Sequence, residues 1–165
     1  MNSPASLNIT GAVTVSAWVN QPIQNNWYAP ILSSGTVNGG AADGQYNLAP
    51  GANSDLLFCV SNGTSQLNVG YVGGPPLNTW THIVGVYNGT DTVNIYANGA
   101  FVNSEYSANF GALNSNKYDS FSVGYGPNPG NYFTGKIDEV RVYDRALSAD
   151  EIGDLYRLGK VEIRR

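Results

Sequence analysis

Three Asn-Gly pairs, each between two extended segments, constrain the fold of this chain more than any other feature. They are Asn62-Gly63, Asn88-Gly89 and Asn98-Gly99. Asn-Gly tolerates positive φ at both central positions of a tight turn, so each pair predicts that successive strands fold back antiparallel. The run from Trp80 to Ser104 is therefore predicted to be a meander of three strands: Trp80–Tyr87, Thr92–Ala97 and Ala100–Ser104.

Other extended segments predict further strands on either side of this meander. They lie at Ala12–Asn20, Ala29–Ser33, Gln45–Leu48, Asp55–Val60, Gln66–Val72, Ser120–Gly124 and Tyr132–Tyr143. About ten strands in one chain imply two packed sheets. The sequence shows no repeat period and no linker, so its 165 residues are predicted to form a single domain.

The C-terminal quarter contains a charged strand. Apolar and polar residues alternate from Glu139 to Tyr143, which predicts Val140 and Val142 on one face of a half-buried strand. Glu139 and Arg141 share the other face, and their opposite charges predict a surface ion pair.

A short helix is predicted directly after this strand. Ser148 lies three residues before Glu151, which is the reciprocal capping-box arrangement. Apolar residues then follow at helical spacing: Ile152, Leu155 and Tyr156. Gly159 is predicted to end the helix, because glycine is favoured just beyond a helix C-terminus.

Four sequence blocks occur in the order found in one known family. They are Leu7–Val19, which ends in Ala-Trp-Val, Trp80–Tyr87 with its Trp-x-His start, Ile95–Gly99, and Gly135–Asp144 with its Ile-Asp-Glu step. The ordered set resembles laminin-G-like domains, which are concanavalin A-like sandwiches of lectins, adhesins and carbohydrate-active enzymes. The resemblance implies an all-β fold, a two-sheet antiparallel jelly-roll sandwich with one short C-terminal helix. It implies less about function, because one fold hosts many activities.

The same resemblance predicts that this chain is a module excised from a longer protein. Family members normally begin with another strand beside the Ile-Asp-Glu strand, whereas this sequence opens at Met1-Asn2-Ser3-Pro4, just past that strand. The tail Lys160–Arg165 alternates apolar and charged residues, which predicts a strand that covers part of the vacant sheet edge. The alternative for this tail is a frayed terminus.

Composition argues against several partners. Only 12% of residues are charged and the net charge is −4, so the chain lacks the basic surface that nucleic-acid binding requires. No segment is apolar over the length needed to span a bilayer. Richness in Asn, Ser, Thr and Gly predicts an extracellular or cell-surface protein. Cys59 is the only cysteine and lies in an apolar run, so it is predicted to be a buried structural thiol.

Catalytic patterns are not visible in the sequence, and we predict that the chain is not an enzyme. The paired carboxylates of a glycosidase must flank one bond, but Asp138 and Glu139 are adjacent and would face opposite sides of a strand. His82 is the only histidine. It lies in the Trp-x-His strand, where the resemblance implies a structural role instead of that of a lyase base.

Sugar recognition fits the sequence better than catalysis. It requires an exposed aromatic face for the apolar side of a pyranose, with amides for its hydroxyls. Two loops offer such residues, and we predict the ligand-binding residues Trp27, Tyr28, Asn128, Asn131 and Tyr132. Trp27 has the alternative role of anchoring its loop. Trp18 and Trp80 lie in predicted core strands and are expected to be packing residues.

A calcium ion is the one cofactor that the resemblance implies. Many family members hold Ca²⁺ at the sandwich rim through the Asp of the Ile-Asp-Glu step, which is Asp138 here. Calcium needs six to eight oxygen ligands. The alternative is a solvated or hydrogen-bonded Asp138.

The sequence therefore predicts a non-catalytic, extracellular, lectin-like module whose partner is a glycan or polysaccharide, with further domains in the same polypeptide. The alternative is a protein-interaction or adhesion module of a larger surface protein, and a glycan hydrolase or lyase domain ranks below both. A lectin-like module predicts aromatic and amide groups gathered at loops, whereas an adhesion module predicts a broad exposed apolar patch.

Overall fold

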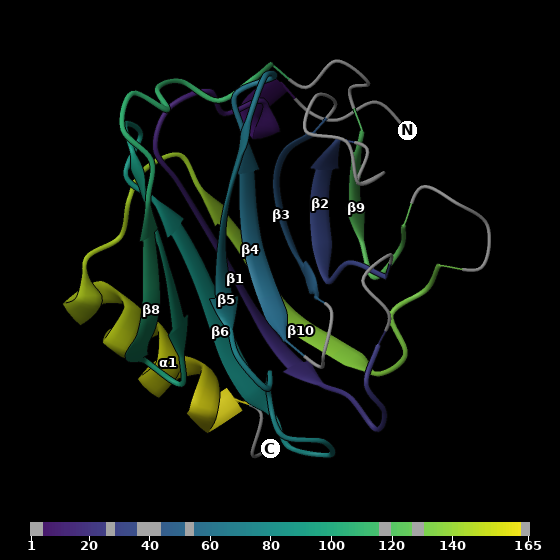
Figure 1. Cartoon of the computed structure of the whole chain (residues 1–165). Helices are drawn as coiled ribbons and strands as arrows, with labels where there is room; N and C mark the ends of the chain where they lie inside the picture. Colours follow the sequence, from purple (N-terminus) through teal and green to yellow (C-terminus); the bar gives the residue numbers. More distant parts are fainter. Residues whose placement is uncertain are drawn as a thin grey trace.

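The computed structural model describes residues 5–25, 29–35, 44–51, 55–115, 120–126 and 131–162. They form two antiparallel sheets of five strands each, here named sheet A and sheet B (Figure 1). Sheet A has the order β10 (Lys136–Tyr143), β1 (Val13–Asn20), β6 (Thr81–Tyr87), β7 (Thr92–Ala97) and β8 (Ala100–Tyr106). Sheet B has the order β5 (Gln66–Tyr71), β4 (Leu56–Ser61), β3 (Gly44–Pro50), β2 (Leu32–Gly35) and β9 (Phe121–Val123). A short 3-10 helix (Ala5–Leu7) precedes the sheets and α1 (Ala149–Glu162) follows them, so the predicted two-sheet fold with a C-terminal helix is confirmed.

The main hydrophobic core lies between the two sheets. Alternate residues of every long strand face it, as the period of a strand requires. Phe58 of sheet B packs against Gly85 of sheet A so closely that a Cβ at Gly85 would lie 2.3 Å from Cγ of Phe58. The hydroxyl group of Tyr46, a fully buried ring, donates to the carbonyl oxygen of Leu7 at 2.9 Å.

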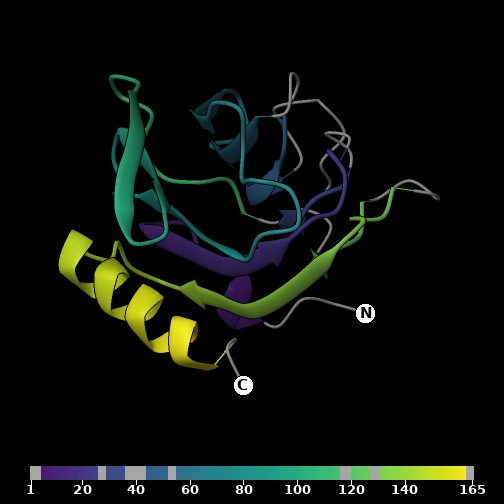
Figure 2. The ribbon, with the colours of Figure 1, turned by 90° about the horizontal axis from the view of Figure 1, so that it is seen from below.

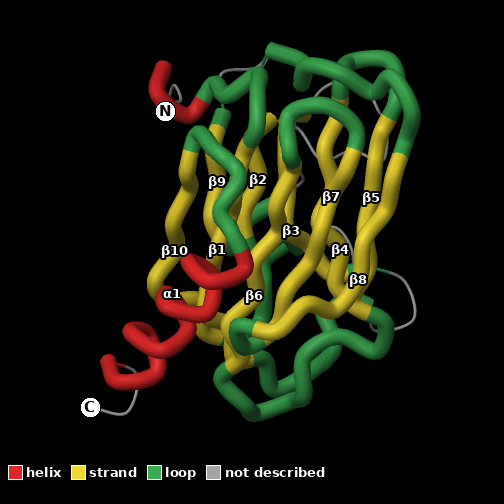
Figure 3. The backbone as a smooth tube through the Cα atoms, turned by 90° about the vertical axis from the view of Figure 1, so that its left-hand side faces the viewer, coloured by secondary structure: helices red, strands yellow, loops and turns green. Residues whose placement is uncertain are grey.

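Helix α1 covers the outer face of sheet A, as Figures 2 and 3 show from two directions. The ring of Trp18 on β1 contacts those of His82 and Tyr156, with ring centroids at 5.3 and 5.6 Å. Ile152 of the helix is fully buried in a second apolar cluster with Val84 and Val86 of β6. The central strands β1 and β6 of sheet A are therefore buried on both faces, whereas β8 at the edge remains largely exposed.

The helix begins where the sequence predicts but extends further. The Ser148 N–H donates to Oε2 of Glu151 at 2.8 Å, and the Glu151 N–H donates to Oγ of Ser148 at 3.3 Å, so the capping box is confirmed. Gly159 was predicted to end the helix, but it is buried and α1 continues past it. Gly159 lies about one turn after Tyr156 and two turns after Ile152, on the same face of the helix. Its missing side chain lets the helix approach Trp18.

The predicted strand at Lys160–Arg165 is wrong for its first half. Residues 160–162 are helical and belong to α1, because the helical face that packs on sheet A extends to Gly159. Residues 163–165 lie outside the described part of the chain.

The three Asn-Gly pairs form turns between antiparallel strands, but only one has the predicted geometry. Asn98 and Gly99 both have positive φ, 51° and 80°. In the other two pairs only the glycine does. In those turns the asparagine side chain closes the loop: Oδ1 of Asn88 accepts hydrogen bonds from the backbone N–H groups of Thr90, Asp91 and Thr92.

A β-bulge in β10 explains the spacing of its apolar residues. Glu139 has a φ of +50°, and the register against β1 shifts at this point. The extra residue lets Ile137 pack against the main core together with Val140 and Val142. Glu139 forms the predicted ion pair with Arg141.

Candidate functional site

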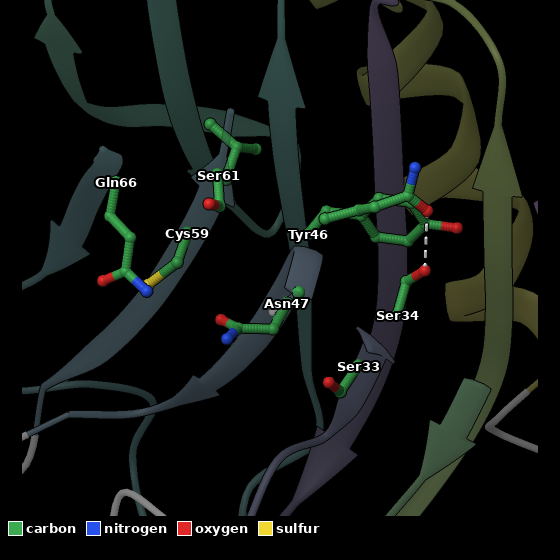
Figure 4. A pocket seen from close by; sticks show the side chains of 10 residues that line it. Ser33, Ser34, Tyr46, Asn47, Cys59, Ser61 and Gln66 are labelled. Atoms are coloured by element: carbon green, nitrogen blue, oxygen red, sulfur yellow. Dashed lines mark hydrogen bonds between the residues drawn. The ribbon is translucent and has the colours of Figure 1, made fainter. Parts of the chain in front are cut away.

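The outer face of sheet B carries a continuous row of small polar side chains, named here the polar row. Its members are direct partners across five neighbouring strands, so they share one face: Ser122, Ser33, Asn47, Cys59 and Asn68. Figure 4 shows Ser33, Asn47 and Cys59 on one side of the sheet, with Tyr46 pointing the other way. The row carries hydroxyl groups, amides and one thiol, and none of its five side chains is charged at neutral pH.

Asn47, at the centre of the polar row, has an unmet hydrogen-bonding group. Its Oδ1 atom is buried and accepts no hydrogen bond within the described part of the structure. Asn47 and Cys59 line a hollow of about 20 Å³, which is room for about one water molecule. A donor placed above this hollow, from water or a ligand hydroxyl group, would satisfy the oxygen.

The sulfur of Cys59 belongs to this outer face of sheet B, where the sequence predicts a buried structural thiol. The side chain is half-buried, yet desolvation by burial raises the pKa of the thiol to about 12. The thiol is therefore protonated at neutral pH and is not a nucleophile.

Two tyrosines form an exposed aromatic pair at the β9 end of the polar row. The rings of Tyr125 and Tyr132 lie 5.4 Å apart with a tilt of 43°, and the two residues form an isolated β-bridge. Their exposed fractions are 39% and 60%. Ser122 of the polar row donates from Oγ to the carbonyl oxygen of Tyr125 at 2.8 Å, which ties the pair to the row.

Two loops far apart in the sequence meet beside this pair. Asn25 donates from Nδ2 to the carbonyl oxygen of Thr134 at 3.1 Å, and its Oδ1 accepts from the Thr134 N–H at 2.6 Å. The Gly124 N–H donates to the carbonyl oxygen of Ile31 at 3.0 Å. The loop after β1 and the loop after β9 are therefore fixed to each other.

The structure brings only some of the predicted ligand-binding residues into view. Tyr132 is exposed within the aromatic pair, and the half-buried Asn131 accepts a hydrogen bond from the Gly126 N–H at its carbonyl oxygen, 2.7 Å. Trp27, Tyr28 and Asn128 lie outside the described residues.

Asp138 supplies a single carboxylate at the predicted calcium position. It is exposed on β10, and its Oδ1 accepts a hydrogen bond from the Glu139 N–H at 2.8 Å. Among the residues that the structure describes, no three His, Cys, Asp or Glu side chains gather as a metal site. A Ca²⁺ ion at Asp138 would therefore need backbone carbonyl, amide or water oxygens as its other ligands.

His82 lies on β6 of sheet A, whereas the polar row lies on sheet B. It is 2% exposed beneath α1, with Oγ of Ser16 2.8 Å from its Nε2. Burial, and then the charge of Arg141, lower the pKa of the imidazole to about 4. The imidazole is therefore neutral and packs against the rings of Trp18 and Tyr156, in agreement with the predicted structural role.

The polar row was not predicted from the sequence. In β4, Leu56, Phe58 and Val60 face the core while Leu57 and Cys59 face outward, but all five are apolar by type. The burial pattern of the strand alternates, and no alternation in polarity signals it. Only the partners across the sheet show that Cys59 lies between Asn47 and Asn68.

Comparison with known proteins agrees with this architecture. The sequence family described as the concanavalin A-like lectin/glucanases superfamily matches residues 1–153. The sequence has no significant match among curated proteins. Within the described residues, no helix has both the length and the apolar character needed to cross a membrane.

Three solved structures with the same fold are binding domains or parts of carbohydrate-active enzymes. The botulinum neurotoxin serotype G binding domain is 17% identical with a TM-score of 0.73, and the alignment covers 96% of this chain and 39% of that one. The CBM40 of the Ruminococcus gnavus IT-sialidase, bound to alpha2,3 sialyllactose, is 16% identical with a TM-score of 0.73, covering 92% and 85%. Domain 4 of AbnA, a GH43 extracellular arabinanase from Geobacillus stearothermophilus in complex with arabinotriose, is 22% identical with a TM-score of 0.70, covering 93% and 70%. At these identities the comparison establishes the fold. This chain spans well under half of the toxin binding domain.

Proposed function

Because this chain belongs to the concanavalin A-like lectin/glucanase superfamily, we propose that it is a non-catalytic carbohydrate-binding module. We place it outside the cell or at the cell surface, as one part of a longer polypeptide. Two structurally similar domains are described as complexes with arabinotriose and with sialyllactose, which supports a glycan as the ligand.

The exposed pair of Tyr125 and Tyr132 is the observation that carries this proposal. A sugar ring has an apolar face, and it is recognised by an exposed aromatic face beside hydrogen-bonding groups. The pair remains 39% and 60% exposed even though the two rings contact each other. A ligand that stacks on the two rings would remove their apolar surface from water.

The polar row supports the same ligand class. The amides of Asn47 and Asn68 can donate and accept hydrogen bonds, which matches the paired hydroxyl groups of a sugar. The hydroxyl groups of Ser33 and Ser122 already donate to backbone carbonyl oxygens. The unpaired Oδ1 of Asn47 offers an acceptor for one such hydroxyl. The row lies on five paired strands, so its groups are held in place before a ligand arrives, and this reduces the entropic cost of binding.

Tyr132→Ala and Trp27→Ala test the assignment by titration against a panel of polysaccharides. Loss of one stacking contact should weaken binding by about 0.5–1.5 kcal/mol, or about two- to tenfold, without lowering the melting temperature. Tyr106→Ala is the matched control, because Tyr106 is 65% exposed on β8 at the far edge of sheet A. Unchanged affinity for both Tyr132→Ala and Trp27→Ala would remove the proposed site.

The same titration with calcium and with a chelator tests the metal. A bound Ca²⁺ at Asp138 would make glycan affinity or thermal stability depend on calcium, and Asp138→Asn would abolish that dependence. Equal results with calcium and chelator would leave Asp138 as a surface carboxylate that caps the Glu139 N–H.

A protein-interaction module is the second candidate, and the edge strand β8 favours it. Phe101 and Tyr106 are 59% and 65% exposed on this strand, whose outer edge is not paired with another described strand. The two candidates differ in the panel experiment: an adhesion module would bind none of the polysaccharides, and Phe101→Ser would impair its capture of a protein partner.

A further inference from the structure

A second hollow lies at the end of the sandwich where β10 begins. It has a volume of about 360 Å³, within the range of small-ligand pockets, and is lined by Asn20, Pro22, Asn78, Gly135 and Lys136. None of these residues belongs to the polar row or to the tyrosine pair, so the hollow is a separate feature of the surface.

The backbone around this hollow is held by close contacts. A Cβ at Gly135 would lie 2.5 Å from the carbonyl oxygen of Asn20, so only glycine allows the start of β10 to approach the end of β1 this closely. On the other side, the Asn78 N–H donates to the carbonyl oxygen of Gln21 at 2.8 Å, and Asn78 has a φ of 56°. The backbone that carries the lining residues is therefore held in place without a ligand.

The polar side chains at the hollow have no hydrogen-bond or ion-pair partner among the described residues. Asn20 and Lys136 are direct partners across the two strands, so their side chains share a face. Among the residues that the structure describes, neither they nor the side chain of Asn78 form a hydrogen bond or ion pair. The next carboxylate along the strand, that of Asp138, accepts a hydrogen bond from the Glu139 N–H instead.

Lys136 differs in this respect from the other described cations. Three arginines, Arg141, Arg145 and Arg157, pair with the carboxylates of Glu139, Glu151 and Asp154. Lys160 lies 5.5 Å from the centre of the Tyr156 ring. In a chain of net charge −4, the ammonium group of Lys136 is thus available beside two free amides.

We propose that this hollow binds the anionic group of an acidic glycan, with Lys136 facing the charge and the amides of Asn20 and Asn78 donating to its oxygens. The anionic group is a carboxylate or a sulfate, since both present several acceptor oxygens to a point charge and neutral donors. This inference rests on the proposed carbohydrate-binding function and names the class of sugar.

The position of the hollow suits one ligand that also reaches the tyrosine pair. Lys136 lies four residues after Tyr132, and this span is at most about 14 Å. Thr134 lies between them, and the Asn25 side chain hydrogen-bonds both the carbonyl oxygen and the N–H of Thr134. A short oligosaccharide can therefore stack one ring on Tyr132 and place a neighbouring acidic group at Lys136.

Lys136→Gln tests the inference on an array of immobilised neutral, uronate-containing, sialylated and sulfated oligosaccharides. We expect the wild-type protein to bind acidic members in preference to their neutral counterparts. Loss of the charge should weaken this binding about tenfold and leave any binding to neutral members unchanged. Lys136→Arg should retain most of the affinity, and added salt should weaken the wild type more than Lys136→Gln. The uronate, sialylated and sulfated members identify the anionic group.

Lys160→Gln is the matched control, because it removes the same charge from an exposed lysine on α1. Binding restricted to neutral sugars, or an equal loss in both lysine variants, would overturn the inference while the proposed function stands. A wild-type protein that binds no member of the array would overturn both.

Discussion

Replacing Gly159 by alanine tests how α1 packs on sheet A. An added Cβ would lie 2.2 Å from Nε1 and 2.9 Å from Cε2 of Trp18. The Trp18 ring is 4% exposed and stacks against both His82 and Tyr156, so it cannot turn aside without loss of those contacts. The helix must instead move away from the sheet, which loosens the burial of Ile152.

The expected cost follows from two opposing effects. Overpacking a rigid contact costs about 1–3 kcal/mol. Alanine gains about 0.5–1 kcal/mol over glycine inside a helix. The free energy of unfolding should therefore fall by up to about 2.5 kcal/mol, and for a domain of this size the melting temperature should drop by up to about 10 °C.

Gly153→Ala in the same helix is the matched control. Its added Cβ would lie 3.4 Å from Nη1 of Arg157, at ordinary contact distance from the end of a flexible side chain. Without a clash, the propensity gain remains, and unfolding should become about 0.5–1 kcal/mol more costly. Urea denaturation and thermal melting of both variants measure the difference. Stabilisation by Gly159→Ala equal to that by Gly153→Ala would refute the described contact with Trp18.

Two further predictions concern single residues whose surroundings set their pKa. His82 should titrate near pH 4 by NMR, and an imidazole midpoint near 6.5 would contradict this. The free energy of unfolding should fall by about 3 kcal/mol as the pH drops from about 6.5 to 4, because the unfolded chain then binds a proton that the folded chain does not. Cys59 has a thiol pKa of about 12, so at pH 8 it should react with a thiol reagent at least about 100-fold more slowly in the folded protein than in urea. Equal rates would show that the thiol is not desolvated.

Local sequence signals predicted the elements of the fold. The capping box of Ser148 and Glu151 and the turn at Asn98-Gly99 act between residues close in the chain, so short-range chemistry is enough to identify them. Strand ends were less accurate: β2 begins at Leu32, not at Ala29, and β10 begins at Lys136, not at Tyr132. At both places the chain is held by contacts with another loop, Gly124 to Ile31 and Thr134 to Asn25, which no local pattern reveals.

The sequence predicted the kind of ligand-binding site, but it identified only some of the residues that form it. Aromatic and amide side chains in loops indicated sugar binding, and Tyr132 is exposed as expected. The polar row was missed because its members come from five strands and meet only through sheet pairing.

The sequence by itself determined the all-β composition, the antiparallel meander and the helix start, because these depend on backbone preferences and alternation within a few residues. The tertiary structure alone decided that Gly159 is a packing position, that the loops of Asn25 and Thr134 meet, and that Lys136 lies beside Asn20 with no ion pair to the described part of the chain. Each of these depends on which strands become neighbours, and that choice is made by burial of the whole core instead of by any one segment.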